Sequence, residues 1–258
     1  MTCELRLGRW QDALADVGEC DALITDPPYS ERTHSGHDAH ESRAYDGAAR
    51  RTLSYAYWTA ADVEAFVLHW GPRTRGWIVA MTDHELVPAW EAAFERVGRY
   101  AFAPLQMMEP GSRVRLAGDG PAQWCTTIMV ARPRTREYLA WGALPGGYLI
   151  RGARGDDRHI GGKPLPGMRA LVRDYSRPGD LVIDPCAGGA TTLLAARMEG
   201  RRAIGAEMDP ATHALAAKRL AKPYTPQLFA DELRTRAAAN DNAEQADLFG
   251  TGSDGGKR

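Results

Sequence analysis

Apolar and polar positions follow two patterns along most of the chain: short apolar runs and longer stretches with a helical period. Runs of the first kind predict buried parallel strands, because both faces of such a sheet are covered. They lie at Cys20–Thr25, Gly76–Met81, Tyr100–Gln106, Thr126–Ala131, Leu181–Ile183 and Arg202–Glu207. Helices are predicted at Thr59–Trp70, Glu85–Val97, Leu165–Tyr175, Thr191–Met198 and Pro210–Leu220. The alternation predicts an α/β fold with a mostly parallel central sheet and helices on both faces.

Three polar stretches interrupt or follow this alternation. Residues 30–54 are rich in His, Arg, Gly and Asp without a regular period, which predicts a long mobile loop. Residues 133–162 are irregular and basic, and predict an inserted segment that is a candidate for target recognition. Residues 223–258 are rich in Ala, Asn, Asp and Gly, which predicts a disordered tail. Residues 1–222 are therefore expected to form a single folded domain.

The composition fits one enzyme-sized domain. The chain has 258 residues, of which 44% are hydrophobic, enough to bury one large core. It shows neither a secretory leader nor an apolar run of the roughly 18 residues that span a bilayer, which predicts a cytoplasmic protein. The cysteines are scattered and predict reduced thiols; they are Cys3, Cys20, Cys125 and Cys186. A formal net charge of -1 is compatible with a DNA partner, because phosphate contacts need only a local basic stripe.

The segment Asp184–Thr192 lies between a predicted strand and a predicted helix and contains the pair Gly188-Gly189. Glycine at such a turn lets the backbone approach a ligand, and the helix start offers unpaired N–H groups. The next predicted strand ends in Glu207, whose carboxylate can accept hydrogen bonds from both hydroxyls of a ribose. Alone, the turn would fit an ordinary strand-to-helix connection equally well. Together, the two features predict a nucleoside cofactor.

The tetrapeptide Asp26-Pro27-Pro28-Tyr29 follows the first predicted strand. The prolines lock the backbone and remove two N–H donors, so their carbonyls can accept hydrogen bonds from a substrate amine. Asp26 supplies a further acceptor and Tyr29 an aromatic face, which suits an exocyclic amine on a base flipped out of a duplex. The alternative is a simple proline turn. A cofactor turn elsewhere in the same chain favours the functional interpretation.

These motifs resemble those of the β group of amino DNA methyltransferases, the N6-adenine/N4-cytosine family. Asp26–Tyr29 matches the tetrapeptide of that family, Asp184–Thr192 resembles its cofactor turn, and His159–Pro164 resembles the Lys-Pro segment before that turn. The tetrapeptide precedes the cofactor turn, an order typical of the DNA enzymes rather than of most RNA adenine enzymes. The resemblance extends over Leu5–Leu220 and implies a Rossmann-like, S-adenosylmethionine-dependent methyltransferase fold with permuted motif order.

The resemblance implies a site-specific enzyme, of the kind found in restriction-modification, that transfers methyl from S-adenosylmethionine to N6 of adenine in double-stranded DNA by base flipping. Its catalytic residues would be Asp26, Pro27, Pro28 and Tyr29. Asp26 and the Pro27 carbonyl would hold the amine while Tyr29 stacks on the base. Its cofactor-binding residues would be Lys163, Pro164, Asp184, Pro185, Cys186, Ala187, Gly188, Thr191, Thr192, Glu207 and Asp209. No metal is needed for this reaction.

The sequence departs from the family pattern at two places. Family members often have an acid after a glycine at the end of the first strand, where it binds the adenine amine of the cofactor. Here Gly8 is followed by Arg9, and the nearest acid is Asp12. In the cofactor turn, Gly189-Ala190 stands where the family more often has Ser-Gly.

Three other functions stay open. Methylation at N4 of cytosine involves a similar amine, although Asp rather than Ser at position 26 favours adenine. A non-catalytic DNA-binding or clamp-associated protein could keep the same fold, and RNA could replace DNA as substrate. The chain could act as a monomer or a homodimer.

Arginines concentrate in segments expected near the catalytic end of the sheet, and they predict phosphate contacts. The DNA-binding candidates are Arg113, Arg115, Arg151, Arg154 and Arg158, accompanied by Arg132, Arg134 and Arg136. The alternative is a solvated basic surface without a partner.

Two further patterns invite a ligand. Histidines recur at His34, His37 and His40 beside Asp38, a spacing that suggests a metal site, but a loop that closes over the flipped base or contacts phosphate is favoured. Near the C-terminus, Gln245, Leu248 and Phe249 stand in a polar tail and resemble the short peptide by which bacterial proteins dock on the replication sliding clamp.

Overall fold

The computed structural model describes residues 2–38, 56–110, 124–150 and 162–223, with the side chains of 35–38 excluded. Residues Met1–Ala221 form one compact unit; the second unit, Lys222–Arg258, is described only at its first two residues. The predicted disordered tail and the clamp peptide at Gln245–Phe249 therefore lie outside the described residues. Among the described helices, none has the length and apolar character to cross a bilayer.

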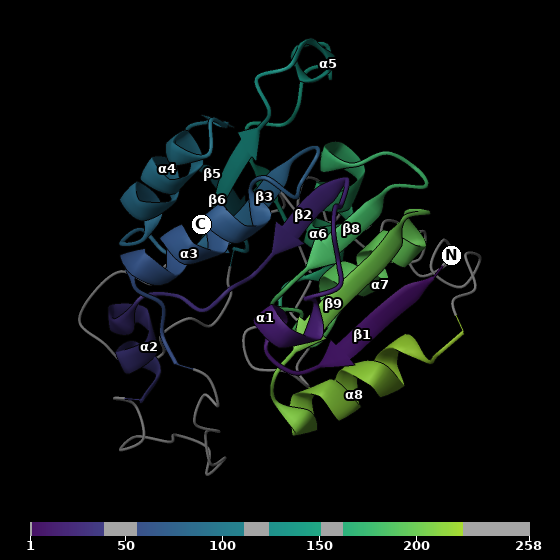
Figure 1. The fold of residues 1–258 in the computed structure, drawn as a ribbon. Coiled ribbons are helices and arrows are strands. Elements are labelled where there is room, and N and C mark those ends of the chain that lie inside the picture. The colour runs from purple at the N-terminus through teal and green to yellow at the C-terminus, as the bar shows by residue number, and fades with distance from the viewer. Residues whose placement is uncertain (1, 39–55, 111–123, 151–161, 224–258) are drawn as a thin grey trace, which may run out of the picture. The chain divides into compact units, whose positions relative to one another are not determined.

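The described strands form one nine-stranded sheet (Figure 1). They are β1 (Cys3–Leu7), β2 (Ala22–Thr25), β3 (Ile78–Thr82), β4 (Tyr100–Ala101), β5 (Leu105–Met108), β6 (Cys125–Arg132), β7 (Tyr148–Leu149), β8 (Leu181–Asp184) and β9 (Arg202–Glu207). The order is β1-β9-β8-β2-β3-β6-β5-β7, with β4 paired to β6. From β1 to β3 all neighbours are parallel, whereas β6 is antiparallel to β3, β4 and β5. The predicted α/β fold with a mostly parallel sheet is confirmed.

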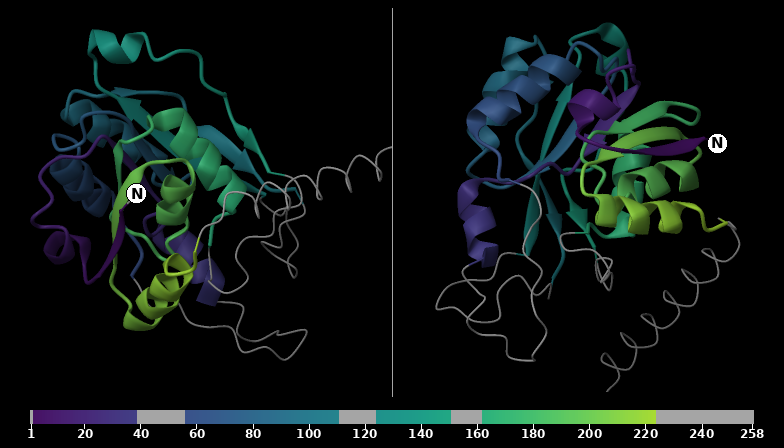
Figure 2. Two further views of the ribbon diagram at one scale, coloured as in Figure 1. Left: turned by 90° about the vertical axis from the view of Figure 1, so that its right-hand side faces the viewer. Right: turned by 60° about the horizontal axis from the view of Figure 1, so that its bottom comes forward.

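Helices cover both faces of this sheet (Figure 2). They are α1 (Trp10–Ala13), α2 (Glu31–Asp38), α3 (Ala60–Trp70), α4 (Val87–Arg96), α5 (Arg136–Leu139), α6 (Leu165–Tyr175), α7 (Thr191–Met198) and α8 (Pro210–Leu220). Residues of α3 and α4 bury their apolar side chains in one core, and residues of α6, α7 and α8 bury theirs in the other. Alternation along β3 serves both cores: Ile78 and Ala80 face the first, Val79 and Met81 the second.

Most predicted elements appear at or near their expected bounds, because their signals are local. The helices α6, α7 and α8 and the strand β9 begin and end where predicted. Thr59 caps α3 through a capping box with Asp62, as its position suggested. Two short elements, β1 and α1, carry too little period to be predicted. The strand expected at Tyr100–Gln106 is divided into β4 and β5, and Pro104 between them cannot donate a ladder hydrogen bond.

Two expectations of irregular structure are wrong in part. Within the expected loop 30–54, Glu31–Asp38 forms α2; its start is held by hydrogen bonds from the Ser30 N–H and the Thr33 hydroxyl to Asp83. Within the expected insertion 133–162, β7 pairs in parallel with β5 and joins the sheet. Tyr148 is buried there, and its hydroxyl donates to Asp174 Oδ2 at 2.9 Å. In both cases contacts with distant residues supply the order that the local sequence lacks.

Candidate active site

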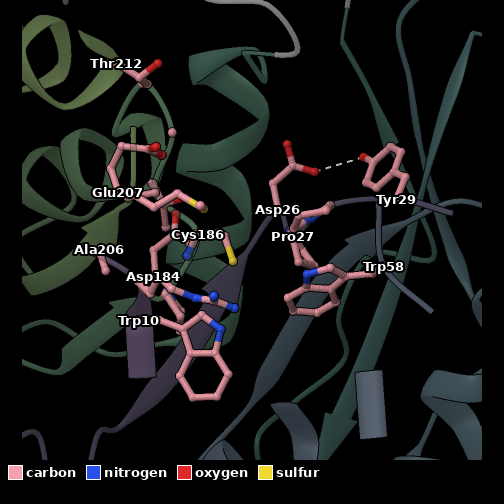
Figure 3. A pocket seen from close by; sticks show the side chains of 18 of the residues that line it. Trp10, Asp26, Pro27, Tyr29, Trp58, Asp184, Cys186, Ala206, Glu207 and Thr212 are labelled. Carbon is pink, nitrogen blue, oxygen red and sulfur yellow. Dashed lines mark hydrogen bonds between the residues drawn. The ribbon is translucent and has the colours of Figure 1, made fainter. Parts of the chain in front are cut away.

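The carboxyl ends of four neighbouring parallel strands meet at one edge of the sheet. Gly8 follows β1 and Asp26 follows β2, while Asp184 and Glu207 are the last residues of β8 and β9. All four residues line one cavity of about 300 Å³. Figure 3 shows Asp26, Asp184 and Glu207 around this cavity, with Tyr29 on the side away from Glu207. The parallel sheet thus brings together the tetrapeptide and the cofactor turn, which are far apart in sequence.

The cavity contains nearly all of the residues predicted from sequence. They are Asp26, Pro27, Pro28, Tyr29, Lys163, Asp184, Pro185, Cys186, Ala187, Gly188, Thr191, Thr192 and Glu207. Pro164 is buried and stands at the start of α6, outside the lining. Asp209 caps α8 by accepting from the Thr212 N–H at 2.7 Å, and its own N–H donates to Glu207 Oε1 at 2.7 Å. Asp209 therefore orients Glu207 from behind the cavity wall.

Asp26 is held on both carboxylate oxygens. Oδ1 accepts a hydrogen bond from the Tyr29 hydroxyl at 2.9 Å, and Oδ2 accepts one from Lys163 Nζ at 2.6 Å. The ion pair is largely shielded, with side-chain exposures of 25% for Asp26 and 13% for Lys163. Lys163 Nζ also lies 5.2 Å from the centroid of the Tyr29 ring, within cation–π range. Lys163, predicted beside the cofactor, is thus joined to the catalytic tetrapeptide.

Asp184 is buried beneath the cofactor turn. Its Oδ1 accepts from the Thr25 hydroxyl at 2.8 Å and from the Cys186 N–H at 3.1 Å. Burial raises the pKa of Asp184 to about 6, although hydrogen bonds from Thr192 and Thr25 oppose that shift. The Asp184 carboxyl group therefore links the cofactor turn, at Cys186, to Thr25 of β2, the residue before Asp26.

The turn itself has an unusual backbone. Gly188 has a φ of 49° and Ala190 a φ of 58°, both in the left-handed region. For a residue with a Cβ this conformation costs about 1–2 kcal/mol. Ala190 is the residue before α7, and the N–H groups of Thr191 and Thr192, in the first turn of that helix, have no partner within the helix itself. The chemistry of such a helix start suits the negative end of a ligand.

Asp83 is a site residue that the sequence did not reveal. It follows β3, and its Oδ2 accepts hydrogen bonds from the Ser30 N–H at 2.9 Å and the Thr33 hydroxyl at 2.6 Å. Burial raises the pKa of Asp83, but the hydrogen bonds from Ser30, Thr33 and the Leu86 N–H outweigh it and lower the pKa overall. The residue immediately after Tyr29 is therefore anchored. An acid two residues after the predicted strand Gly76–Met81 was the available signal.

The predicted DNA-contacting arginines are only partly accounted for. Arg113, Arg115, Arg151, Arg154 and Arg158 lie outside the described residues. Because β5 and β7 run parallel to β3, their carboxyl ends, which lead into those segments, point to the edge that carries the cavity. Arg132 is the last residue of the antiparallel strand β6, and Arg134 and Arg136 follow it, so the expectation that they lie near the catalytic end is wrong.

The histidine pattern yields no metal site in the part of the chain that the structure describes. His34 lines the cavity and packs against Tyr57 with ring centroids 6.2 Å apart. The side chains of His37, Asp38 and His40 fall outside the description. Over the described residues, no group of three His, Cys, Asp or Glu side chains is placed to hold an ion.

Comparisons with known proteins agree with this geometry. A family model described as DNA methylase matches residues 133–218. YubD of Escherichia coli (strain K12) is 36% identical over 67 residues, 26% of this chain and 30% of that protein. The type II methyltransferase M.HindIII of Haemophilus influenzae is 39% identical over 62 residues, 24% of this chain and 20% of that enzyme. The matches therefore span less than a third of either relative.

Solved structures share the fold over most of the chain. The M1.HpyAVI complex with S-adenosylmethionine is similar with a TM-score of 0.58 and 19% identity, over 84% of this chain and 98% of that one. The cytosine-N4-specific PvuII DNA methyltransferase is similar with a TM-score of 0.58 and 16% identity, over 90% and 92%. The chain has the Rossmann-like fold of the S-adenosylmethionine-dependent methyltransferases, and its residues 133–218 match the DNA methylase family model.

Proposed function

We propose that this protein transfers the methyl group of S-adenosylmethionine to the exocyclic N6 of adenine in double-stranded DNA. The observation that carries the proposal is the single cavity in which the Asp26–Tyr29 tetrapeptide, the Asp184–Thr192 turn and Glu207 meet. A nucleoside-binding carboxylate and an amine-binding carboxylate at one cavity suit methyl transfer between a nucleoside cofactor and an amine. The complex of M1.HpyAVI with S-adenosylmethionine supports the choice of cofactor.

The cofactor would lie along the strand ends. Glu207, oriented by the Asp209 N–H, accepts hydrogen bonds from the ribose hydroxyls. Gly188 and the N–H groups that open α7 would hold the methionine part of the cofactor. The cofactor would supply the methyl group, and Asp26, on the neighbouring strand β2, would hold the amine that receives it.

The target amine would bind at Asp26 and the Pro27 carbonyl. Each Asp26 oxygen accepts one hydrogen bond, from Tyr29 or from Lys163, and can accept a second one from the entering amine, while the Tyr29 ring would stack on the base. Holding the amine hydrogens helps the nitrogen to pyramidalise and attack in line. The N–C bond forms as the S–C bond breaks, S-adenosylhomocysteine leaves, and the surplus proton passes from the methylated nitrogen to water.

The decisive experiment incubates the protein with labelled S-adenosylmethionine and DNA, digests the DNA to nucleosides and identifies the methylated base. N6-methyladenine in the wild type and its loss in Asp26→Asn would support the proposal. N4-methylcytosine as sole product would refute the choice of base, and label in RNA alone would refute the polymer. The fold shared with the cytosine-N4-specific PvuII enzyme keeps N4 of cytosine as the second candidate. Cofactor binding without any product would favour a non-catalytic protein of the same fold.

Two partner proposals rest on sequence alone. Arg151 and Arg154 would contact DNA phosphates, and reversing both to Glu should weaken binding and flatten its salt dependence. A sliding clamp would bind Leu248 and Phe249, so wild-type protein should capture the clamp and the double Ala variant should not. Unchanged binding in either variant would remove those residues from the respective interface.

A further inference from the structure

The end of the cavity beside Glu207 is built by the segment that joins β1 to α1. Leu7 is paired with Glu207 in the parallel ladder, and the Gly8 N–H donates to the Glu207 carbonyl at 2.9 Å. Gly8 has a φ of 136°, which turns the chain so that Arg9, Trp10 and Gln11 line the cavity. If Glu207 binds the ribose, as the proposed function requires, the purine on the same sugar lies next to this segment.

Trp10 offers that purine a fixed aromatic surface. Its ring makes edge contacts with His69 at 4.9 Å and with Phe66 at 5.5 Å between centroids, both from α3. Figure 3 shows the indole among the side chains that line the cavity. Stacking of a base on an aromatic side chain is worth about 1–3 kcal/mol and does not depend on the substituents of the base.

The polar groups of this segment do not select an amino group. Arg9 is a donor only, and the Gln11 amide can either donate or accept, depending on its orientation. A 6-amino purine needs an acceptor at this edge, whereas a 6-oxo purine needs a donor. An ionised carboxylate would favour the amino form and repel the oxo form. Arg9 favours the oxo form, and Gln11 can satisfy both.

The carboxylates of the described cavity wall already accept hydrogen bonds from protein groups outside the segment that joins β1 to α1. Asp26 holds Lys163 and Tyr29, and Asp184 is buried under the turn. Asp62 Oδ2 accepts from the Thr59 N–H at 2.8 Å and from the Thr59 hydroxyl in the capping box. Asp12, the acid nearest to Arg9 in sequence, is exposed and absent from the cavity lining.

We propose that the cofactor site recognises the purine by stacking on Trp10 and does not discriminate the 6-amino from the 6-oxo group. The proposal rests on the proposed function, because it takes Glu207 as the ribose ligand. It predicts that S-inosylhomocysteine, which has inosine in place of adenosine, binds about as tightly as S-adenosylhomocysteine, the product of the cofactor.

The test measures dissociation constants of S-adenosylhomocysteine and S-inosylhomocysteine by titration calorimetry. For wild type, we expect the two to agree within about fivefold, since an unsatisfied buried hydrogen-bonding group would cost about 1–3 kcal/mol, or roughly fivefold to 150-fold. Arg9→Asp places an acceptor beside the purine and should raise the preference for the adenosyl compound beyond that limit. The matched control Arg136→Asp makes the same charge change far from the cavity and should leave the ratio unchanged. Trp10→Ala should weaken both compounds by a similar factor of about ten.

Wild-type preference for the adenosyl compound above fivefold would overturn the inference. Loss of that preference in Asp62→Asn would identify Asp62 as the residue that reads the amine. If S-adenosylhomocysteine binds and its inosine analogue does not, only this inference fails. If neither compound binds, the proposed function fails with it.

Discussion

The packing of the cofactor turn against β9 can be tested by adding one methyl group. Gly205 pairs with Asp184 across the parallel ladder. A Cβ at Gly205 would lie 2.8 Å from the Asp184 carbonyl oxygen, 2.8 Å from Leu193 Cδ1 and 3.0 Å from Ala187 Cβ. Two of these neighbours are a backbone atom and a Cβ, which cannot rotate away, so the turn itself must shift.

We expect Gly205→Ala to destabilise the protein by about 3 kcal/mol, the upper end of the usual cost of overpacking. At roughly 2–4 °C per kcal/mol for a domain of this size, the melting temperature should fall by about 6–12 °C. Because the displaced residues begin the turn, S-adenosylhomocysteine should also raise the melting temperature of the variant less than that of wild type. Thermal unfolding with and without S-adenosylhomocysteine measures both the fall in melting temperature and the rise that the ligand causes.

Gly18→Ala is the matched control. A Cβ at Gly18 meets nothing within 4 Å, and its φ is outside the left-handed region. The control should therefore match wild type or gain up to about 1 kcal/mol from the smaller entropy of its unfolded chain. Equal melting temperatures of Gly205→Ala and Gly18→Ala would refute the close packing of turn and strand.

Three further variants test the site and its supports. Asp26→Asn should bind S-adenosylhomocysteine normally but lose methyl transfer about 100-fold or more, measured as label entering DNA; parallel loss of ligand binding would contradict its assigned role. In the wild type, burial raises the pKa of Asp184 from 3.8 to about 6. The free energy of unfolding therefore falls as the pH rises through that interval, and the total loss is about 3 kcal/mol. Asp184→Asn should therefore gain about 1.5 kcal/mol relative to wild type between pH 5 and pH 8 in urea unfolding, and a pH-independent difference would refute the burial argument. Thr59→Ala should cost about 1 kcal/mol by loss of the α3 capping box, and a change below about 0.3 kcal/mol would show that the cap contributes little.

Local patterns sufficed for the parts of this protein whose causes lie within one element. The bounds of α6, α7, α8 and β9 follow from apolar spacing and turn residues, which act between near neighbours in sequence. The tetrapeptide and the cofactor turn were recognisable for the same reason. Each is a short segment at a strand end, where the backbone chemistry is set by its own prolines or glycines.

The pairing of these segments into a site depended on tertiary structure. Lys163 contacts Asp26, and Asp83 holds the start of α2, because the strand order brings together residues that no local pattern relates. The direction of β6 moved Arg132 and its neighbours away from the cavity for the same reason. The sequence by itself determined which chemical groups the protein carries and on which strand ends they stand. Only the sheet decided which of them meet, because hydrogen bonds and ion pairs form between atoms a few ångströms apart, whatever their separation along the chain.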